Sequence, residues 1–465
     1  MGTSVQSIDE PSTCCFTLSK RNRGPAVRIL ITGASGFIGR ALAAALLERG
    51  HTVVLASRSA SRRTAPGTAE VAGPGRSEAL DVDFSQAPSA SWWTPRLAGV
   101  DAVVNAVGIL REQGGQRFDA LHTRAPAELF RACAFAGVGA VIQVSALGAD
   151  ESAQSDYHRS KRAADDVLRS LPLHGAIVQP SLVYGVEGES ARLFNRLAAA
   201  PVLAMPRSGA VQVQPVHLDD VVAGLMALIA SPPARIETIP FAGPQALSLR
   251  DYLAGLRRRL GWGRSWMLPF PESWFLLMAS LASRLPGSFL DRDTAGMLLR
   301  GTTGPAGSLQ RLLGHPARPV EAFLTEAEAA AARTAVVLDV ALPALRLTLA
   351  FLWLWTAAVS LGLYPVQDSY ALLARVGLTG VMATVALYGA ALLDLLLGIA
   401  TLASPRRWRR IVWALQLALI AGYTVLISVF LPEYWLHPYG PISKNLPIMA
   451  AIGLLWALEP VSPRR

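Results

Sequence analysis

The sequence is poor in charged residues. Only 16% of its 465 residues are Asp, Glu, Lys or Arg, well below the roughly 25% of an average soluble domain. Charges become rare after about residue 343, which indicates a membrane segment rather than one large soluble core. The chain is also longer than one compact core normally organises, so at least two folding units are expected.

Cysteine is scarce too, and its spacing excludes a disulfide framework. Cys14 and Cys15 are adjacent, Cys133 stands alone, and none of them has the spacing of a zinc site. We therefore expect a reducing compartment and no metal. Residues 1–25 lack the apolar core of a signal peptide, so we expect a disordered leader before a domain that is not exported.

The net charge of +10 does not by itself indicate a nucleic-acid partner. The arginines occur in short groups rather than along one basic stripe with interleaved aromatic residues. Two groups, at 406–410 and 464–465, border apolar spans, where Lys and Arg mark the cytoplasmic side of a membrane. We therefore expect a lipid bilayer as partner and no nucleic acid.

Apolar spans end the chain, at about 343–363, 376–403, 411–431 and 446–460. The first three reach the roughly 20 residues that a helix needs to cross a bilayer, and the fourth is short. If the basic loop 404–410 and the basic C-terminus both face the cytoplasm, the fourth span must cross as well. Residues 340–465 are thus predicted to form a four-helix domain of the inner (cytoplasmic) membrane. The N-terminal domain and the C-terminus would be cytoplasmic.

Polar residues interrupt these spans. Asp394 in the second span and Gln416 in the third lie at comparable depth and could pair. An intramembrane carboxylate is costly and is a functional candidate, although a helix-packing hydrogen bond explains it equally well. In the loop before the last span, Glu433 and His437 could be ligands, but a position at the membrane interface explains them better.

The first 185 residues alternate apolar runs with helical patterns. The run 27–32 has the length of a buried strand, and 40–49 reads as a helix closed by Gly50. Further strands are expected at 52–56, 102–105, 140–145 and 176–179, with a helix at 126–136. This alternation predicts an α/β fold with a Rossmann-type, doubly wound parallel sheet over residues 26–185.

Residues 186–335 lose this alternation and become richer in proline. We expect a small substrate lobe, mostly helical, with sheet elements near 211–216 and 238–241 that return to the core. Residues 266–285 are apolar, and a buried helical core explains them better than docking on a membrane surface. His217, with Asp219 and Asp220, lacks metal spacing and is expected to shape the lobe.

The turn after the first strand carries glycines at positions 33, 36 and 39. In such a strand–turn–helix, one glycine permits the tight turn, one lets the backbone approach a pyrophosphate, and one allows close helix packing. The helix then offers free N–H groups to the phosphates. We therefore expect a dinucleotide here, bound by Gly33, Gly36, Phe37, Ile38, Gly39 and Arg40.

The end of the second strand bears on the choice of cofactor. It reads Leu55-Ala-Ser-Arg58 and lacks the acid that binds the ribose 2′-hydroxyl of NAD. Arg58, helped by Arg40 or Arg62, could instead pair with a 2′-phosphate. NADP(H) is therefore favoured, and NAD(H) stays the alternative.

Tyr157 and Lys161 are four residues apart, which places both on one face of a helix. A nearby ammonium stabilises a phenolate and would lower the tyrosine pKa toward the working pH. Tyr157 could then exchange a proton with a substrate oxygen while hydride moves to or from a nicotinamide. Ser145 would donate to the developing oxyanion. Surface Tyr–Lys pairs are common, and only the coincidence with Ser145 and the glycine turn distinguishes this one.

The order of these motifs resembles the extended and atypical short-chain dehydrogenase/reductase families over about residues 27–330. The matching segments are GASGFIG at 33–39, Asn105-Ala-Val-Gly108, Ser145, YxxxK at 157–161 and Pro180-Ser-Leu-Val-Tyr-Gly185. The resemblance implies that Ser145, Tyr157 and Lys161 are catalytic and that Lys161 also holds the nicotinamide ribose. It further implies cofactor contacts by Asp83, Phe84, Asn105, Ala106, Gly108, Tyr157 and Pro180.

Two further resemblances narrow the family. Residues 144–150 and 213–220 resemble the branch related to the 39-kDa accessory subunit of respiratory complex I. The hydropathy of the tail, with the loop 435–447, resembles the DoxX-like four-helix membrane family.

These features predict a membrane-anchored, NAD(P)H-dependent oxidoreductase of the short-chain dehydrogenase/reductase type. It would transfer hydride at a carbonyl or alcohol of a hydrophobic small molecule. A second hypothesis is a non-catalytic NAD(P)H sensor or assembly factor, with a membrane respiratory or quinone complex as partner, although a sensor needs no acid–base pair. A third hypothesis is an NAD-dependent epimerase/dehydratase that recycles its cofactor in place.

Overall fold

The computed structural model describes residues 26–63, 74–206, 211–282 and 292–459. The chain divides into two compact units, Met1–Arg333 and Thr334–Arg465, and each is described by itself. The predicted leader and the end of the predicted fourth span lie outside the described residues.

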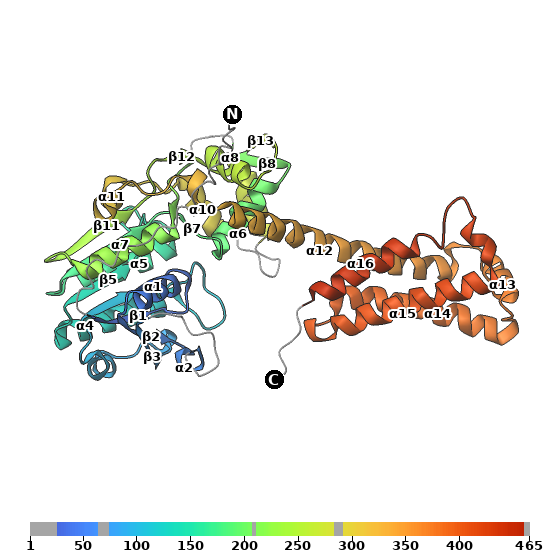
Figure 1. The fold of residues 1–465 in the computed structure, drawn as a ribbon, viewed down its shortest axis with the longest axis horizontal. Coiled ribbons are helices and arrows are strands. Elements are labelled where there is room, and N and C mark those ends of the chain that lie inside the picture. The colour runs from blue at the N-terminus through green and yellow to red at the C-terminus, as the bar shows by residue number, and fades with distance from the viewer. Residues whose placement is uncertain (1–25, 64–73, 207–210, 283–291, 460–465) are drawn as a thin grey trace, which may run out of the picture. The chain divides into compact units, whose positions relative to one another are not determined.

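A parallel sheet organises the first unit, with strand order β11-β6-β5-β4-β1-β2-β3 (Figure 1). The strands are β1 (Arg28–Thr32), β2 (Thr52–Ser57), β3 (Arg76–Asp81), β4 (Ala102–Asn105), β5 (Ala140–Val144), β6 (Gly175–Pro180) and β11 (Ile236–Phe241). This confirms the predicted doubly wound fold. The strand order reverses between β1 and β4, and such a switch point is where open α/β sheets bind ligands, beyond the carboxyl ends of the strands.

Helices cover both faces of this sheet, which explains why its central strands are apolar throughout. The helices are α1 (Phe37–Glu48), α7 (Leu218–Ala230) and α11 (Gly307–Leu313) on one face, and α4 (Ala125–Ala136) and α5 (Asp156–Arg169) on the other. Alternate residues of β1 serve the two faces. Ile29 and Ile31 pack with Leu42 of α1, whereas Leu30 packs on the opposite side with Phe130 of α4.

The predicted substrate lobe contains helices and short strand pairs around its own apolar cluster. The helices are α6 (Glu189–Ala199), α8 (Leu249–Arg259), α9 (Glu272–Ala282) and α10 (Arg292–Arg300). The strand pairs are β7 (Val183–Tyr184) with β10 (Val216–His217), β9 (Gln212–Val213) with β12 (Leu247–Ser248), and β8 (Val202–Pro206) with β13 (Trp266–Phe270). Tyr184, Phe194, Tyr252 and Phe323 are buried together at its centre. Part of this stretch belongs to the main sheet, because β11 forms its edge strand and α7 packs on one of its faces.

A buried core for residues 266–285 is wrong where side chains are described. Trp266 is 77% exposed and Trp274 53% exposed, and Leu268 and Leu277 are also exposed. The large apolar side chains described in β13 and α9 are therefore on the surface and not packed in a core. His217 caps α7, and its ring lies beside Tyr184 and Phe323 of the lobe, as expected of a residue that shapes the lobe. Arg318 pairs with Asp219 and Asp220.

The second unit consists of apolar helices. They are α12 (Glu326–Ala358), which begins in the first unit, α14 (Gly380–Ala403), α15 (Arg406–Phe430) and the shorter α16 (Asn445–Leu458). The amphipathic α13 (Val366–Arg375) precedes α14, so the second span starts four residues later than predicted. Three helices are long and apolar enough to cross a membrane: Glu326–Leu363, Gly380–Ala403 and Arg406–Phe430. At about 1.5 Å per residue, α16 is shorter than a hydrocarbon core, and its crossing stays a prediction.

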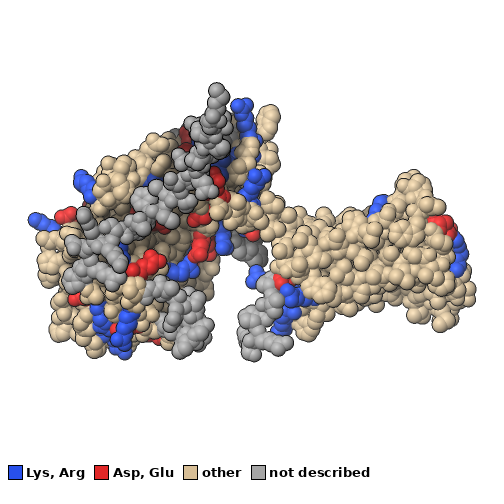
Figure 2. Space-filling model, viewed as in Figure 1, with Lys and Arg blue, Asp and Glu red and all other residues tan. Residues whose placement is uncertain are grey.

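The surface of the second unit has the distribution of charge that a bilayer requires. Figure 2 shows a face almost free of Lys, Arg, Asp and Glu, with charges gathered at its ends. Arg409, at the start of α15, pairs with Glu459, and Glu433, just after the end of α15, pairs with Arg375. Glu433 therefore has an ion-pair partner, and the described residues contain no cluster of metal ligands.

The predicted pair between Asp394 and Gln416 is not formed. Gln416 donates to Thr401 Oγ1 at 2.7 Å, and Arg346 donates to the carbonyl oxygen of the same Thr401 at 2.8 Å. Asp394 is buried, and its Oδ1 has no hydrogen-bond partner among the described residues. The hydrogen bonds that join α12, α14 and α15 therefore meet at Thr401.

Candidate active site

The glycine turn brings two strand ends into close contact. Gly33 has φ +70°, and a Cβ there would lie 2.7 Å from the backbone of Ala106 after β4. A Cβ on Gly39 would lie 2.3 Å from the carbonyl oxygen of Gly33. Both positions therefore require glycine, and together they set the start of α1 against the end of β1.

Helix α1 starts with free backbone donors. Its N-cap is Gly36, which has no side chain to satisfy the first N–H groups. Unpaired donors and the positive end of the helix dipole favour an anion at this place. This supports the predicted site for a pyrophosphate.

A small cavity of about 150 Å³ lies beside this turn, at the ends of β2 and β3. Arg58, Asp83 and Phe84 line it, as does Gln116, which the sequence did not suggest. The Gln116 amide lies 3.2 Å from the exposed Arg58 guanidinium. Asp83 accepts from the backbone N–H of Ser85 at 3.0 Å, which fixes its carboxylate at the rim.

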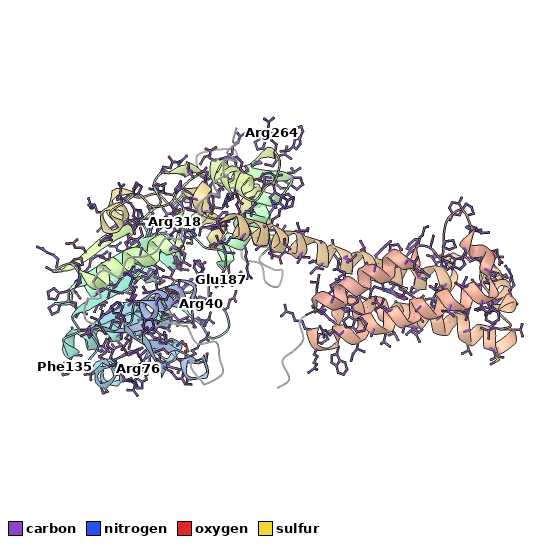
Figure 3. All side chains as sticks on the ribbon, in the orientation of Figure 1. Arg40, Arg76, Phe135, Glu187, Arg264 and Arg318 are labelled. Carbon is purple, nitrogen blue, oxygen red and sulfur yellow. The ribbon has the colours of Figure 1, made fainter. Side chains whose placement is uncertain are left out.

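Three of the predicted cofactor contacts, Gly39, Arg40 and Asn105, line neither cavity. Arg40 lines neither cavity, and its guanidinium pairs with Glu187 at 2.5 Å (Figure 3). Asn105 lines neither cavity because it is buried in the sheet, where it accepts from Thr32 Oγ1 at 2.6 Å and donates to Gln143 at 2.7 Å. Asn105 thus holds the turn that follows β4. The side chain of Arg62, the other suggested helper of Arg58, lies outside the described side chains.

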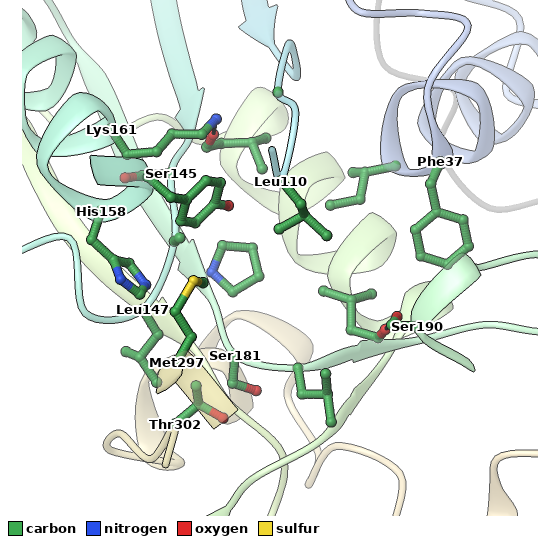
Figure 4. A pocket seen from close by; sticks show the side chains of 18 of the residues that line it. Phe37, Leu110, Ser145, Leu147, His158, Lys161, Ser181, Ser190, Met297 and Thr302 are labelled. Carbon is green, nitrogen blue, oxygen red and sulfur yellow. Dashed lines mark hydrogen bonds between the residues drawn. The ribbon is translucent and has the colours of Figure 1, made fainter. Parts of the chain in front are cut away.

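A larger cavity of about 390 Å³ contains the predicted catalytic residues (Figure 4). Ser145 follows β5, Tyr157 and Lys161 come from α5, and all three line the cavity with Pro180 of β6. Phe37 and Ile38 of the glycine turn line its far side. The two cavities share the following residues: Gly36, Ala106, Gly108 and Ile109. They therefore form one groove across the carboxyl edge of the sheet.

Lys161 is fixed by the ends of two strands. It is buried, and its Nζ donates to the carbonyl oxygens of Val107 and Val144 at 3.0 Å each. Burial lowers the pKa of Lys161. An ammonium has three donors, so one remains for a ribose hydroxyl in the groove.

Tyr157 does not have the lowered pKa that the sequence suggested. Burial, followed by the charge of Asp165, raises its pKa to about 12. The neighbouring ammonium of Lys161 is directed to backbone carbonyls instead. Tyr157 is therefore protonated at neutral pH and suited to donate a proton, which a carbonyl reduction requires.

His122 is a buried member of the site that sequence reasoning missed. It comes from the π-helical turn η3 (Asp119–Arg124), where it accepts from the N–H of Ile109 at 3.0 Å and pairs with Ser160 at 2.9 Å. Its ring lies 5.5 Å from the ring of Tyr157. Burial and the charge of Lys161 lower the pKa of His122 to about 2, so it is neutral. No motif marks this histidine in the sequence.

Asp165 is a second buried group that was missed. Ser145 Oγ donates to its Oδ2 at 2.5 Å, and the side chain is fully buried. Asp165 lies four residues after Lys161 on α5, so helix periodicity places the two on the same face. This spacing could have identified Asp165 from the sequence.

Comparison with protein families agrees with this geometry. Residues 29–238 match the NAD dependent epimerase/dehydratase family, and residues 350–453 match the DoxX-like family. The chain joins an epimerase/dehydratase domain to a DoxX-like domain. The predicted resemblances are thereby confirmed.

Two curated relatives and one solved structure illustrate the range of the epimerase/dehydratase domain. A ceramide reductase of Caulobacter vibrioides is 32% identical over 213 residues, 44% of this chain and 61% of that protein. The mitochondrial NADH dehydrogenase [ubiquinone] 1 alpha subcomplex subunit 9 of Arabidopsis thaliana is 28% identical over 256 residues, 52% of this chain and 60% of that protein. The chain thus spans about three fifths of these relatives. A nucleoside-diphosphate-sugar epimerase from Staphylococcus aureus shares the fold, with TM-score 0.51 and 15% identity over 64% of this chain and 99% of that one.

The groove of the epimerase/dehydratase domain fits a nicotinamide dinucleotide. It offers a cationic rim at Arg58, unpaired N–H groups at the start of α1, and a free donor on Lys161. These groups match the adenine ribose, the pyrophosphate and the second ribose in order along the groove.

Proposed function

We propose that this protein is an NADP(H)-dependent reductase that acts on a carbonyl of a hydrophobic, lipid-like substrate at the cytoplasmic face of the inner membrane. The observation that carries the proposal is the meeting of Ser145, Tyr157 and Lys161 in one largely apolar cavity. The cavity opens into the groove beside the glycine turn, where a nicotinamide would deliver its hydride.

The residues take distinct roles in this reaction. When bound beside the glycine turn, a reduced nicotinamide would supply the hydride that the carbonyl carbon accepts. Tyr157, which is protonated at neutral pH, donates its proton to the carbonyl oxygen, so the product is an alcohol. Ser145 hydrogen-bonds the same oxygen as negative charge develops on it. Lys161 holds the ribose, and its position between the ends of β4 and β5 orients it.

The preference for NADP(H) rests on Arg58. It lines the small cavity at the end of β2, where an NAD enzyme would place an acid. A planar guanidinium suits a phosphate because it donates two parallel hydrogen bonds. NAD(H) is the alternative that this arrangement disfavours.

The substrate side of the cavity supports a hydrophobic substrate. Its apolar lining includes Leu110, Leu147, Leu182, Leu193, Phe194 and Met297. One relative is named as a reductase of ceramide, which is a lipid. The DoxX-like domain also ties the active site to a bilayer, where such substrates concentrate.

The exposed apolar surface of β13 and α9 supports access from the membrane surface. Trp266 and Trp274 are its aromatic members, and Leu268 and Leu277 lie with them. Tryptophan is enriched where proteins meet the headgroup region of a bilayer. The neighbouring helix α10 contributes Met297 and Leu298 to the cavity.

Turnover of ketones by the full chain in lipid nanodiscs tests the proposal. NADPH oxidation would be followed with long-chain ketone lipids, including the ketone related to ceramide, and with short soluble ketones. We expect the long-chain ketones to be preferred by at least about tenfold in kcat/KM. Tyr157→Phe should lower kcat by about 10²–10⁴-fold without changing NADPH affinity. The control is Tyr439→Phe at an exposed position, which should leave both kcat and NADPH affinity unchanged. Turnover of polar, soluble substrates alone would overturn the proposal.

Two other functions have specific support. Similarity to a complex I accessory subunit favours a nucleotide-binding sensor or assembly factor, which would bind NADPH and turn over no ketone. The family match favours an epimerase or dehydratase, which would convert substrate without net NADPH consumption. The nanodisc assay separates both from a reductase.

A further inference from the structure

Asp165 does not line the cavity, but its side chain is hydrogen-bonded to the hydroxyl of Ser145, which does. The distance from Ser145 Oγ to Asp165 Oδ2 is 2.5 Å, and Asp165 is fully buried without lining the cavity. Its other oxygen, Oδ1, has no hydrogen-bond partner among the described residues. Lys161 does not neutralise it by direct contact, because the ammonium donates to Val107 and Val144. Asp165 therefore has one hydrogen-bonded neighbour, and that neighbour is a proposed catalytic residue.

The direction of this hydrogen bond matters because a hydroxyl has only one proton. If Asp165 is ionised, its carboxylate accepts the Ser145 proton, and Ser145 can only accept a hydrogen bond from the cavity. If Asp165 is protonated, its carboxylic O–H donates to Ser145 Oγ, and the Ser145 proton is free to point at a substrate oxygen. The oxyanion of a carbonyl under reduction needs a donor, whereas an alcohol under oxidation needs an acceptor.

We propose that Asp165 is a positioning residue that shares a titratable proton with Ser145 and decides whether Ser145 donates or accepts in the cavity. The consequence for catalysis rests on the proposed function, because reduction is the direction that needs the protonated carboxyl. The shared proton itself does not depend on which substrate the cavity takes.

The surroundings of Asp165 favour a carboxyl that can hold a proton. Burial raises its pKa, while the bond from Ser145 and the charges of Lys161 and Arg169 oppose this rise. Asp166 adds a like charge from the same helix, and Tyr157 on α5 is neutral. Three further groups on elements packed against α5 are neutral: His122 of η3, Cys133 of α4 and Thr238 of β11, which accepts from Arg169. The charged groups of these elements lie toward the surface, where Asp119 pairs with Arg124 and Glu128 with Arg131, and Glu237 is exposed.

Infrared titration of the full chain tests the shared proton without any substrate. A protonated carboxyl group has its own C=O stretching band, and the difference between wild type and Asp165→Asn isolates the band of Asp165. Between about pH 5 and about pH 9, we expect this band to disappear as the carboxyl ionises. Ser145→Ala should shift the midpoint upward, because it removes a hydrogen bond that stabilises the carboxylate. Absence of the band over this range, or a midpoint that Ser145→Ala leaves unchanged, would overturn the inference.

Kinetics of ketone reduction in nanodiscs test the consequence. Wild-type kcat should fall as pH rises through the titration of Asp165, because the carboxylate then takes the Ser145 proton. Asp165→Asn should keep kcat within about threefold at neutral pH and lose this decline, since its amide can donate to Ser145 at every pH. Asp165→Leu should lower kcat by about tenfold. Glu151→Gln, a change at an exposed acid that pairs with Arg162 of the same helix, should leave the pH profile unchanged.

The outcomes separate the two proposals. An infrared band coupled to Ser145, without turnover of any ketone, would refute the proposed reductase and leave the shared proton standing. Ketone turnover with an identical pH profile in wild type and Asp165→Asn would refute the role of Asp165 and leave the reductase standing.

Discussion

Lys161 Nζ lies 3.0 Å from the carbonyl oxygen of Val144, the residue before Ser145. This hydrogen bond ties helix α5 to the end of β5 and so helps to fix the distance between the two elements that carry the proposed catalytic residues. A second bond of the same length, to Val107, ties the helix to the turn after β4. Lys161 therefore has a structural role even without a cofactor, because it joins α5 to the ends of two strands.

Replacement of Lys161 by Met should therefore impair both stability and binding. Two carbonyl oxygens would lose their donor, at about 1–3 kcal/mol each, and the ribose would lose a ligand. We expect a lower thermal midpoint of the nucleotide-free chain and at least about tenfold weaker NADPH binding. Lys444→Met, at an exposed position of the second unit, is the matched control. An unchanged thermal midpoint in Lys161→Met would argue against this structural role of Lys161.

Arg58→Glu should reverse the nucleotide preference. The charge change removes the partner of a 2′-phosphate and supplies the acid that a ribose 2′-hydroxyl prefers. We expect NADPH affinity to fall by about 10- to 100-fold, with NADH affinity unchanged or higher. Nucleotide fluorescence with the full chain measures both. Arg40→Glu is the control, because Arg40 pairs with Glu187 outside the groove. Equal losses in the two variants would show a general electrostatic effect instead.

Gly39→Ala should damage the glycine turn. Its Cβ would lie 2.3 Å from the carbonyl oxygen of Gly33, so α1 must move away from β1. Overpacking of this kind costs about 1–3 kcal/mol, and the displaced helix start should bind NADPH less tightly. Thermal unfolding and nucleotide fluorescence report the two effects. Gly115→Ala, where a Cβ would meet nothing within 4 Å, should leave both unchanged.

His122 should make the first unit less stable in acid. Its pKa is about 2 in the folded chain, against 6.5 for an ordinary histidine. Below about pH 6.5 the unfolded chain binds a proton that the folded chain refuses, so the free energy of unfolding falls by about 1.4 kcal/mol per pH unit. Above that pH the histidine is neutral in both states and adds no pH dependence.

His122→Gln should remove this contribution. The variant should be less stable at neutral pH, because it loses one of two hydrogen bonds, but its thermal midpoint should fall less steeply between about pH 6.5 and about pH 5. Parallel slopes for wild type and variant would contradict a neutral buried histidine.

Local patterns in the sequence were sufficient for the main architecture. The apolar runs 27–32 and 140–145 form β1 and β5, and the glycines at 33, 36 and 39 form the turn as expected. Strand and helix periodicity depends on neighbours in the chain, so one sequence contains that information. The long apolar spans could be recognised for the same reason, because a helix that crosses a bilayer must satisfy its backbone within one segment. The positions of Ser145, Tyr157 and Lys161 on one cavity also agree with their order in the family.

Only the tertiary structure decided what surrounds these residues. Asp165 lies twenty residues from Ser145 in sequence, and His122 comes from a separate turn, yet both are buried against the proposed catalytic residues. Burial raises the pKa of Tyr157, where the spacing of the YxxxK motif alone suggested the opposite. The same applies to Asn105, which is hydrogen-bonded inside the sheet, and to Trp266, which is exposed. The sequence by itself determined which elements form, because periodicity and turn chemistry are local. The structure decided protonation, burial and partner choice, because these depend on the dielectric and the donors that distant segments bring together.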